Sequence, residues 1–205
     1  FTARGGKAFG LLGRNGAGKT TLADVIMGLL PPQSGKICMD GVDILTMKSQ
    51  WAKIIGYVPQ TVFLIDDSIR KNVAFGMKDE EISDEKVWNA LEKAQLKTFV
   101  ESLPKGLDTI VGERGVKFSG GQRQRVAIAR ALYEAPDILI FDEATSALDG
   151  ETEEAVMQSI DALQGQITLI IVAHRLTTIR NCDKIYEIKG GKAVLKDKKD
   201  VFPNN

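Results

Sequence analysis

GRNGAGKT, residues 13–20, follows the apolar run AFGLL (8–12) and precedes a helical pattern that starts near residue 18. A glycine-rich loop between a strand and a helix is the setting of a phosphate-binding P-loop. Its glycines let backbone N–H groups converge on phosphate oxygens, and the helix N-terminus adds a positive dipole. In such a loop Lys19 reaches the β- and γ-phosphates and the Thr20 hydroxyl ligates Mg²⁺. The stretch predicts binding of a nucleoside triphosphate with magnesium and favours its hydrolysis; the alternative is a glycine-rich turn with an exposed lysine.

Further short apolar runs occur at 54–58, 138–141 and 169–173, with helical patterns between them. Runs of this kind suit strands that are buried on both faces, so we expect a parallel sheet flanked by helices. We therefore predict a single α/β domain of the P-loop NTPase (RecA-like) class over 1–205. Residues 1–66 and 134–205 form its expected core.

Helical signals dominate the stretch between the two core segments, 67–133, which we interpret as an inserted α-helical subdomain. Ser83 is a plausible N-cap, and apolar residues recur at i, i+3, i+4 and i+7 from Val87 to Ala94. A second amphipathic helix is expected from about Glu151. Near the C-terminus, two short apolar runs around Gly190-Gly191 predict a hairpin.

Charge and composition exclude several classes of protein. The 27 basic side chains equal the 27 acidic ones, so no net field draws the chain to nucleic acid, and no nucleic-acid partner is expected. The longest apolar stretch, 167–173, is far shorter than the roughly 20 residues of a membrane-spanning helix. Cys38 and Cys182 lie far apart and outside any CxxC spacing, which fits reduced thiols.

The segment ILIFDE, 138–143, combines a buried strand with two adjacent acids. Asp142 can hold the Mg²⁺ shell while Glu143 orients or deprotonates the attacking water, because the two roles need distinct carboxylates beside one metal. A strand followed by an acidic helix cap would give the same letters. The P-loop upstream favours the catalytic interpretation.

The segment FSGGQ, 118–122, opens a helix that runs through Leu132. Ser119 looks like its N-cap, and the two glycines leave the first helical amides bare, so the segment is a second potential anion site. The alternative is a glycine-rich helix start with arginines on a solvated face.

Taken in order, GRNGAGKT, Gln60, FSGGQ, ILIFDE, SALD (146–149) and His174 resemble the nucleotide-binding domain of ABC transporters over nearly the whole chain. The resemblance implies that two copies pack head to tail, each ATP lying between one P-loop and the partner's FSGGQ segment. It implies catalytic roles for Glu143, His174, Lys19 and Gln60, and magnesium ligation by Thr20, Gln60 and Asp142. The implied ATP-binding residues are Gly13, Arg14, Asn15, Gly16, Ala17, Gly18, Lys19, Thr20, Thr21, Gln60, Ser119, Gly120, Gly121, Gln122, Asp149 and His174.

VGERG, 111–115, looks like the segment of exporter-type members that touches the intracellular loops of the membrane domains. The stretch 51–149 is most similar to bacterial exporters and flippases of lipids or lipid-linked oligosaccharides. The resemblance therefore implies an exporter at the cytoplasmic face of a membrane, with transmembrane domains contacted near Gln60 and Val111–Gly115, while the chain itself is expected to be soluble. Alternatives are a soluble ABC-type ATPase, or the noncatalytic half of a heterodimer.

Two features depart from the family pattern. Phe118 stands where the family usually has Leu, an apolar exchange that should preserve packing. The chain also begins after the position of the family's adenine-stacking aromatic and of the first antiparallel strands. The resemblance therefore implies an N-terminally truncated domain with a partial antiparallel β subdomain, which binds ATP mainly through its phosphates.

Overall fold

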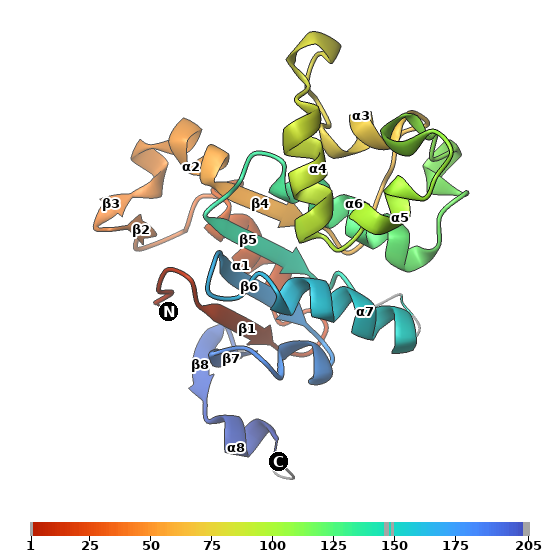
Figure 1. Cartoon of the computed structure of the whole chain (residues 1–205). Coiled ribbons are helices and arrows are strands. Elements are labelled where there is room, and N and C mark those ends of the chain that lie inside the picture. Colours follow the sequence, from red (N-terminus) through yellow and green to blue (C-terminus); the bar gives the residue numbers. More distant parts are fainter. Residues whose placement is uncertain (1, 146–147, 149, 203–205) are drawn as a thin grey trace. The chain divides into compact units, whose positions relative to one another are not determined.

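The apolar run before the glycine-rich loop forms strand β1 (Ala8–Leu12), and four of its five residues are buried. β1 pairs in parallel with β6 (Thr168–Ala173), which pairs in parallel with β5 (Ile138–Asp142). The sheet order is β4-β5-β6-β1-β7-β8, with β4 (Ile55–Val58) at one edge (Figure 1). Every residue of β6 is buried. The predicted parallel core sheet is confirmed, because apolar runs without alternation form strands that are covered on both faces.

The computed structural model describes residues 2–145, 148 and 150–202. The chain divides into two compact units. The sheet unit comprises Phe1–Tyr57, Pro136–Glu143 and Gly165–Asn205, and the helical unit comprises Val58–Ala135 and Ala144–Gln164. The stretch 67–133, expected as the helical insertion, lies wholly within the helical unit.

The C-terminal part of the sheet is the predicted hairpin. β7 (Lys184–Lys189) pairs in parallel with β1 and antiparallel with β8 (Lys192–Lys196). Gly190 and Gly191 between them have φ of 55° and 72°, a left-handed turn that glycine adopts without strain. The short helix α8 (Lys198–Val201) follows β8.

A second antiparallel pair in the sheet unit consists of β2 (Cys38–Met39) and β3 (Val42–Asp43). It is followed by a 3₁₀ turn, η1 (Ile44–Thr46), and by helix α2 (Lys48–Ile54). The apolar patterns of the sequence did not predict α2. Its buried Trp51 donates a hydrogen bond from Nε1 to the Ile26 carbonyl at 2.8 Å, so tertiary packing against the preceding helix holds it in place.

A hydrophobic core lies inside the sheet unit. It joins side chains of β1, β5 and β6 to those of α1 (Lys19–Ile26) and α2. Its buried members are Phe9, Leu11, Ala23, Ile26, Ile44, Trp51, Ile140, Ile170, Val172 and Tyr186. Burying a side chain of this kind contributes about 1.5–3 kcal/mol. The core therefore fixes the strand ends at which the polar residues of the site stand.

Five α-helices organise the described part of the helical unit, and two predicted N-caps are confirmed. Its helices are α3 (Ile69–Val73), α4 (Asp84–Lys93), α5 (Lys97–Glu101), α6 (Gly120–Leu132) and α7 (Gly150–Asp161). The Ser83 side chain accepts a hydrogen bond from the Lys86 amide at the start of α4. Ser119 caps α6, and its backbone N–H donates in return to the Gln122 side chain. This reciprocal capping box stabilises the start of α6.

In the described part of the chain, no helix combines the length and the apolar character that crossing a bilayer requires. Cys38 is exposed and Cys182 is buried, and the two do not form a disulfide.

Candidate nucleotide site

The polar residues of the sheet unit converge because neighbouring parallel strands end at the same level. Leu12, the last residue of β1, pairs with Ala173, and Asp142 pairs with Val172. The glycine-rich loop, Glu143 and His174 follow directly on these three strands. The carboxyl edge of a parallel sheet is where α/β proteins bind ligands. The structure thus brings Gly13–Thr21, Asp142, Glu143 and His174 together.

The loop between β1 and α1 has the backbone that its glycines allow. Gly16 and Gly18 have φ of 74° and 95°, and side chains built there would be strained. A Cβ on Gly13 would lie 2.9 Å from the Ile188 carbonyl oxygen, which is too close. Gly18 is the N-cap of α1 and has no side chain to occupy the first helical amides. The loop therefore presents bare N–H groups at a helix N-terminus, which suits a phosphate.

Lys19 is buried at the base of this loop, with 4% of its surface exposed. Its ammonium donates to the carbonyl oxygens of Gly13 at 3.0 Å and Arg14 at 3.2 Å. It also lies 3.6 Å from the Glu143 carboxylate. A buried charge must be paired or hydrogen-bonded, and these three oxygens meet that need. The cation is thereby held beside the loop amides.

Glu143 and His174 face each other at the ends of β5 and β6. His174 Nε2 lies 2.5 Å from Glu143 Oε1, and the side chain of Glu143 is only 11% exposed. The Glu143 N–H donates to the Val172 carbonyl at 2.9 Å, and its φ is 50°. A non-glycine residue in this left-handed region costs about 1–3 kcal/mol and persists only where its surroundings hold it. The strained backbone fixes a carboxylate within reach of an imidazole.

Asp142 lies between two hydroxyl groups. The Thr20 hydroxyl is 3.4 Å from Oδ1 and the Tyr57 hydroxyl is 3.4 Å from Oδ2. Burial raises the pKa of Asp142, and the nearby Glu143 charge adds to the effect, while the Thr20 and Tyr57 hydroxyls oppose it. Hard oxygen donors at this spacing fit Mg²⁺, which takes carboxylate and hydroxyl ligands together with phosphate oxygens. In the described residues no group of three His, Cys, Asp or Glu could hold a metal by itself.

Tyr57 is a site residue that sequence reasoning missed. Burial, followed by the charge of Asp142, raises its pKa to about 12. Its folded-state pKa lies above the ordinary value of 10, so its contribution to stability is present below pH 10 and is lost as the pH rises toward 12. We expect the phenolate absorbance that Tyr57→Phe removes from the spectrum to have a midpoint near pH 12. If the absorbance lost in Tyr57→Phe instead titrated with the midpoint of a free tyrosine, the contact between Tyr57 and Asp142 would be contradicted.

The other predicted site residues belong to the helical unit, where they are described in their own surroundings. Ser119 and Gln60 are exposed, and Gly121 is buried against α7, since a Cβ there would lie 2.4 Å from Thr152 Cγ2. A Cβ on Gly120 would lie 3.1 Å from Leu148 Cδ2. Packing therefore leaves no room for a side chain at Gly121, whereas at Gly120 the Leu148 side chain would have to shift by a few tenths of an ångström. Asp149 lies outside the described residues.

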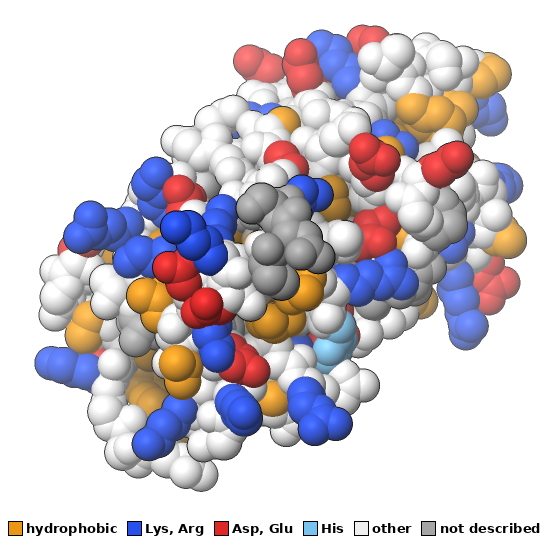
Figure 2. Space-filling model, turned by 90° about the horizontal axis from the view of Figure 1, so that it is seen from below, with side chains coloured by type: hydrophobic (Ala, Val, Ile, Leu, Met, Phe, Trp, Pro, Cys, Tyr) orange, Lys and Arg blue, Asp and Glu red, His pale blue; other side chains and the backbone are white. Residues whose placement is uncertain are grey.

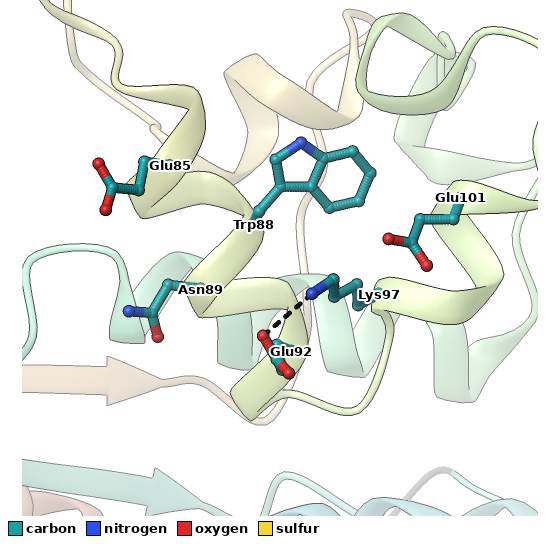
Figure 3. Close-up of a pocket in the computed structure, with 6 residues that line it drawn as sticks. All are labelled: Glu85, Trp88, Asn89, Glu92, Lys97 and Glu101. Atoms are coloured by element: carbon teal, nitrogen blue, oxygen red, sulfur yellow. Dashed lines mark hydrogen bonds and ion pairs between the residues drawn. The ribbon is translucent and has the colours of Figure 1, made fainter.

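A pocket of about 470 Å³ in the helical unit has a different character (Figure 3). Its lining residues are Glu85, Trp88, Asn89, Glu92, Lys97 and Glu101. Lys97, the single cation among them, is paired with Glu92 at 3.2 Å. An excess of carboxylates repels phosphate, so this pocket does not suit a nucleotide.

Elsewhere on the surface, Figure 2 shows acidic and basic side chains interspersed over one face, in keeping with the balanced composition.

The loop amides and the buried Lys19 can receive phosphates. The two acids at the carboxyl end of β5, which β6 separates from β1, can serve a metal and a water molecule. This combination on a parallel sheet defines the P-loop NTPase class. The ABC transporter family model matches residues 1–146, and the chain belongs to the ABC transporter family. Its fold is that of the nucleotide-binding domain, the ATPase domain of this family.

Comparison with known proteins gives relatives along the whole chain. ABC transporter B family member 21 of Arabidopsis thaliana is 42% identical over 205 residues, which is 100% of this chain and 16% of that protein. The ATP-dependent lipid A-core flippase of Francisella tularensis subsp. tularensis is 44% identical over 193 residues, which is 93% of this chain and 31% of that protein. A solved structure, a bacterial Atm1-family ABC exporter with ATP bound, matches 99% of this chain and 36% of its own with a TM-score of 0.85 at 38% identity. The chain thus spans less than a third of the two curated relatives.

Proposed function

We propose that the chain is the ATP-hydrolysing engine of an exporter. Two nucleotide-binding domains pack head to tail when ATP binds and separate after hydrolysis, and attached membrane domains alternate their access in response. The grouping of Glu143, His174 and Lys19 at one sheet edge carries the proposal, with 2.5 Å between the carboxylate and the imidazole. This grouping also favours a catalytic copy over a noncatalytic half of a heterodimer.

The loop residues would hold the triphosphate. Backbone amides of Gly13–Thr20 would bind phosphate oxygens, and the Lys19 ammonium would turn from the loop carbonyls to the β- and γ-phosphates. Thr20 and Asp142 would hold Mg²⁺, with Gln60 as a third ligand. The ion, when bound, supplies positive charge that stabilises the phosphate oxygens in the transition state.

Glu143 is the proposed general base. Its carboxylate would accept a proton from the attacking water while His174, hydrogen-bonded to it, holds the water and contacts the γ-phosphate. The strained backbone at Glu143 and the short contact to His174 support a fixed geometry, and positioning of this kind lowers the barrier.

The second half of each site would come from the other copy. Ser119, Gly120, Gly121 and Gln122 would contact the γ-phosphate, and the exposed Ser119 at the N-terminus of a 13-residue helix supports this role. Asp149 is proposed to couple the two sites across the dimer.

The partner of the helical unit would be a membrane domain, contacting it near Gln60 and Val111–Gly115 at the cytoplasmic face. Apolar side chains beside both positions support this: Phe63 is 60% exposed and Val116 is 75% exposed. Relatives of almost equal identity carry different names, so the similarity supports export without choosing a cargo.

The test is ATP turnover as a function of protein concentration. A dimeric active site predicts a rate per chain that rises with concentration and then saturates, because each chain alone provides half of the site. A rate per chain that does not depend on concentration would contradict the dimer, and the absence of any ATP hydrolysis would contradict the catalytic role.

A further inference from the structure

Arg130, near the end of α6, is a cation whose bonds to other described residues all go to neutral groups. Its Nε donates to the Asn72 carbonyl at 2.7 Å, and its two terminal nitrogens donate to the Phe63 carbonyl at 2.9 Å and to Asn72 Oδ1 at 3.1 Å. Its Cζ lies 4.7 Å from the centre of the Phe75 ring. Burial lowers the pKa of Arg130. The partly buried guanidinium is thus held by two main-chain oxygens, one side-chain amide oxygen and an aromatic ring.

Asn72 continues this network into the segment 63–75. Its side chain is fully buried and uses its whole hydrogen-bonding capacity. Oδ1 accepts from the Ile65 amide at 3.0 Å as well as from Arg130. Nδ2 donates to the carbonyls of Ile65 and Ser68, both at 3.0 Å. The side-chain amide of Asn72, itself bonded to Arg130, therefore holds the conformation of the segment 63–75.

The segment 63–75 is in turn bonded to the strand-like stretch before VGERG. The Val111 amide donates to the Asp67 carbonyl, and the Ile69 amide donates to the Thr109 carbonyl, each at 3.0 Å. The side chains of Phe63 and Phe75 at its two ends are 60% and 54% exposed. The segment that follows Gln60 and the start of VGERG are thus both linked to Arg130. These are the regions where we propose contact with a membrane domain.

We propose that Arg130 is a positioning residue that transmits the state of the Ser119–Gln122 end of α6 to the segment 63–75. The inference rests on the proposed role of Ser119–Gln122 in contacting ATP. Arg130 lies about 16 Å along the helix from Ser119, and a continuous helix moves as a rigid rod over this length. The planar guanidinium donates to the carbonyl oxygens of Asn72 and Phe63 in a fixed geometry. A shift of α6 should therefore move the segment 63–75 with it.

The experiment measures hydrogen exchange of the amides in 63–75 in the purified protein, all of its domains in place, with and without a nonhydrolysable ATP analogue. We expect exchange in this segment to change about 10-fold on nucleotide binding, within the usual range of coupling between sites. In Arg130→Lys, which keeps the charge and loses the planar fork, the analogue should bind with unchanged affinity. The nucleotide-dependent change in 63–75 should then be largely lost.

Arg125→Lys is the matched control. Arg125 lies on the same helix, is likewise desolvated so that its pKa is lowered, and donates to the Gln95 carbonyl instead. It should retain the full response. Arg130→Gln provides a second variant, which keeps a hydrogen-bond donor without the charge and should also lose the response.

Three outcomes would overturn the role of Arg130. The first is a folded Arg130 variant that keeps the full nucleotide-dependent change in hydrogen exchange of 63–75. The second is an equal loss of this change in Arg125→Lys. The third is a parent protein that binds the analogue without any change of exchange in 63–75. A parent protein that binds no nucleotide would instead refute the proposed function, so the two failures are distinguishable.

Discussion

Glu143→Gln should slow ATP hydrolysis by about 10²–10⁴-fold, the usual contribution of a general base, while ATP remains bound. Glutamine keeps an oxygen that can hydrogen-bond His174, whose Nε2 lies 2.5 Å from the carboxylate, but it cannot take a proton from water. The bound state should therefore accumulate as an ATP-containing dimer. Single-turnover hydrolysis and size-exclusion chromatography with ATP measure the two effects.

Glu134→Gln is the control for this change. Glu134 is an exposed carboxylate paired with Lys86 at 3.4 Å, and its loss should leave turnover as it was. If Glu143→Gln hydrolyses ATP at the parental rate, the assignment of the base to Glu143 is wrong.

The second large effect is expected on the affinity for ATP when Lys19 is replaced. Lys19→Met keeps the unbranched stem of the buried side chain and removes only its ammonium. Hydrogen bonds to a charged group contribute about 1.5–3 kcal/mol, so ATP affinity should fall by roughly 10–150-fold. Direct binding measured by calorimetry separates this loss from any loss of turnover.

Lys53→Met is the comparison for Lys19→Met, because Lys53 is an exposed lysine of the same unit, on α2. It should bind ATP as the parent does. Melting temperatures of both variants check that the loop still folds, since the carbonyls of Gly13 and Arg14 lose a donor only in Lys19→Met. Equal affinity in the two variants would show that Lys19 does not bind phosphate.

Local patterns in the sequence determined the frame of the site. Strands β1, β5 and β6 were predicted because short uninterrupted apolar runs are typical of strands that are buried on both faces of a parallel sheet. The loop before α1 and the cap at Ser119 were predicted because glycine and serine act on their immediate neighbours in sequence. The placement of Glu143 and His174 at one sheet edge follows from these strands being parallel neighbours.

Only the tertiary structure decided which distant groups meet. The contact of Tyr57 with Asp142 joins residues 85 positions apart, and that of Arg130 with Asn72 joins residues 58 apart. No periodicity or motif encodes such pairs, because each depends on how whole elements pack. Helix α2 escaped prediction for the same reason, since its anchor is the bond from Trp51 to Ile26. The sequence by itself determined which residue types form the glycine-rich loop. Packing decided that the Tyr57 hydroxyl contacts Asp142 and that Arg130 is bonded to the segment 63–75.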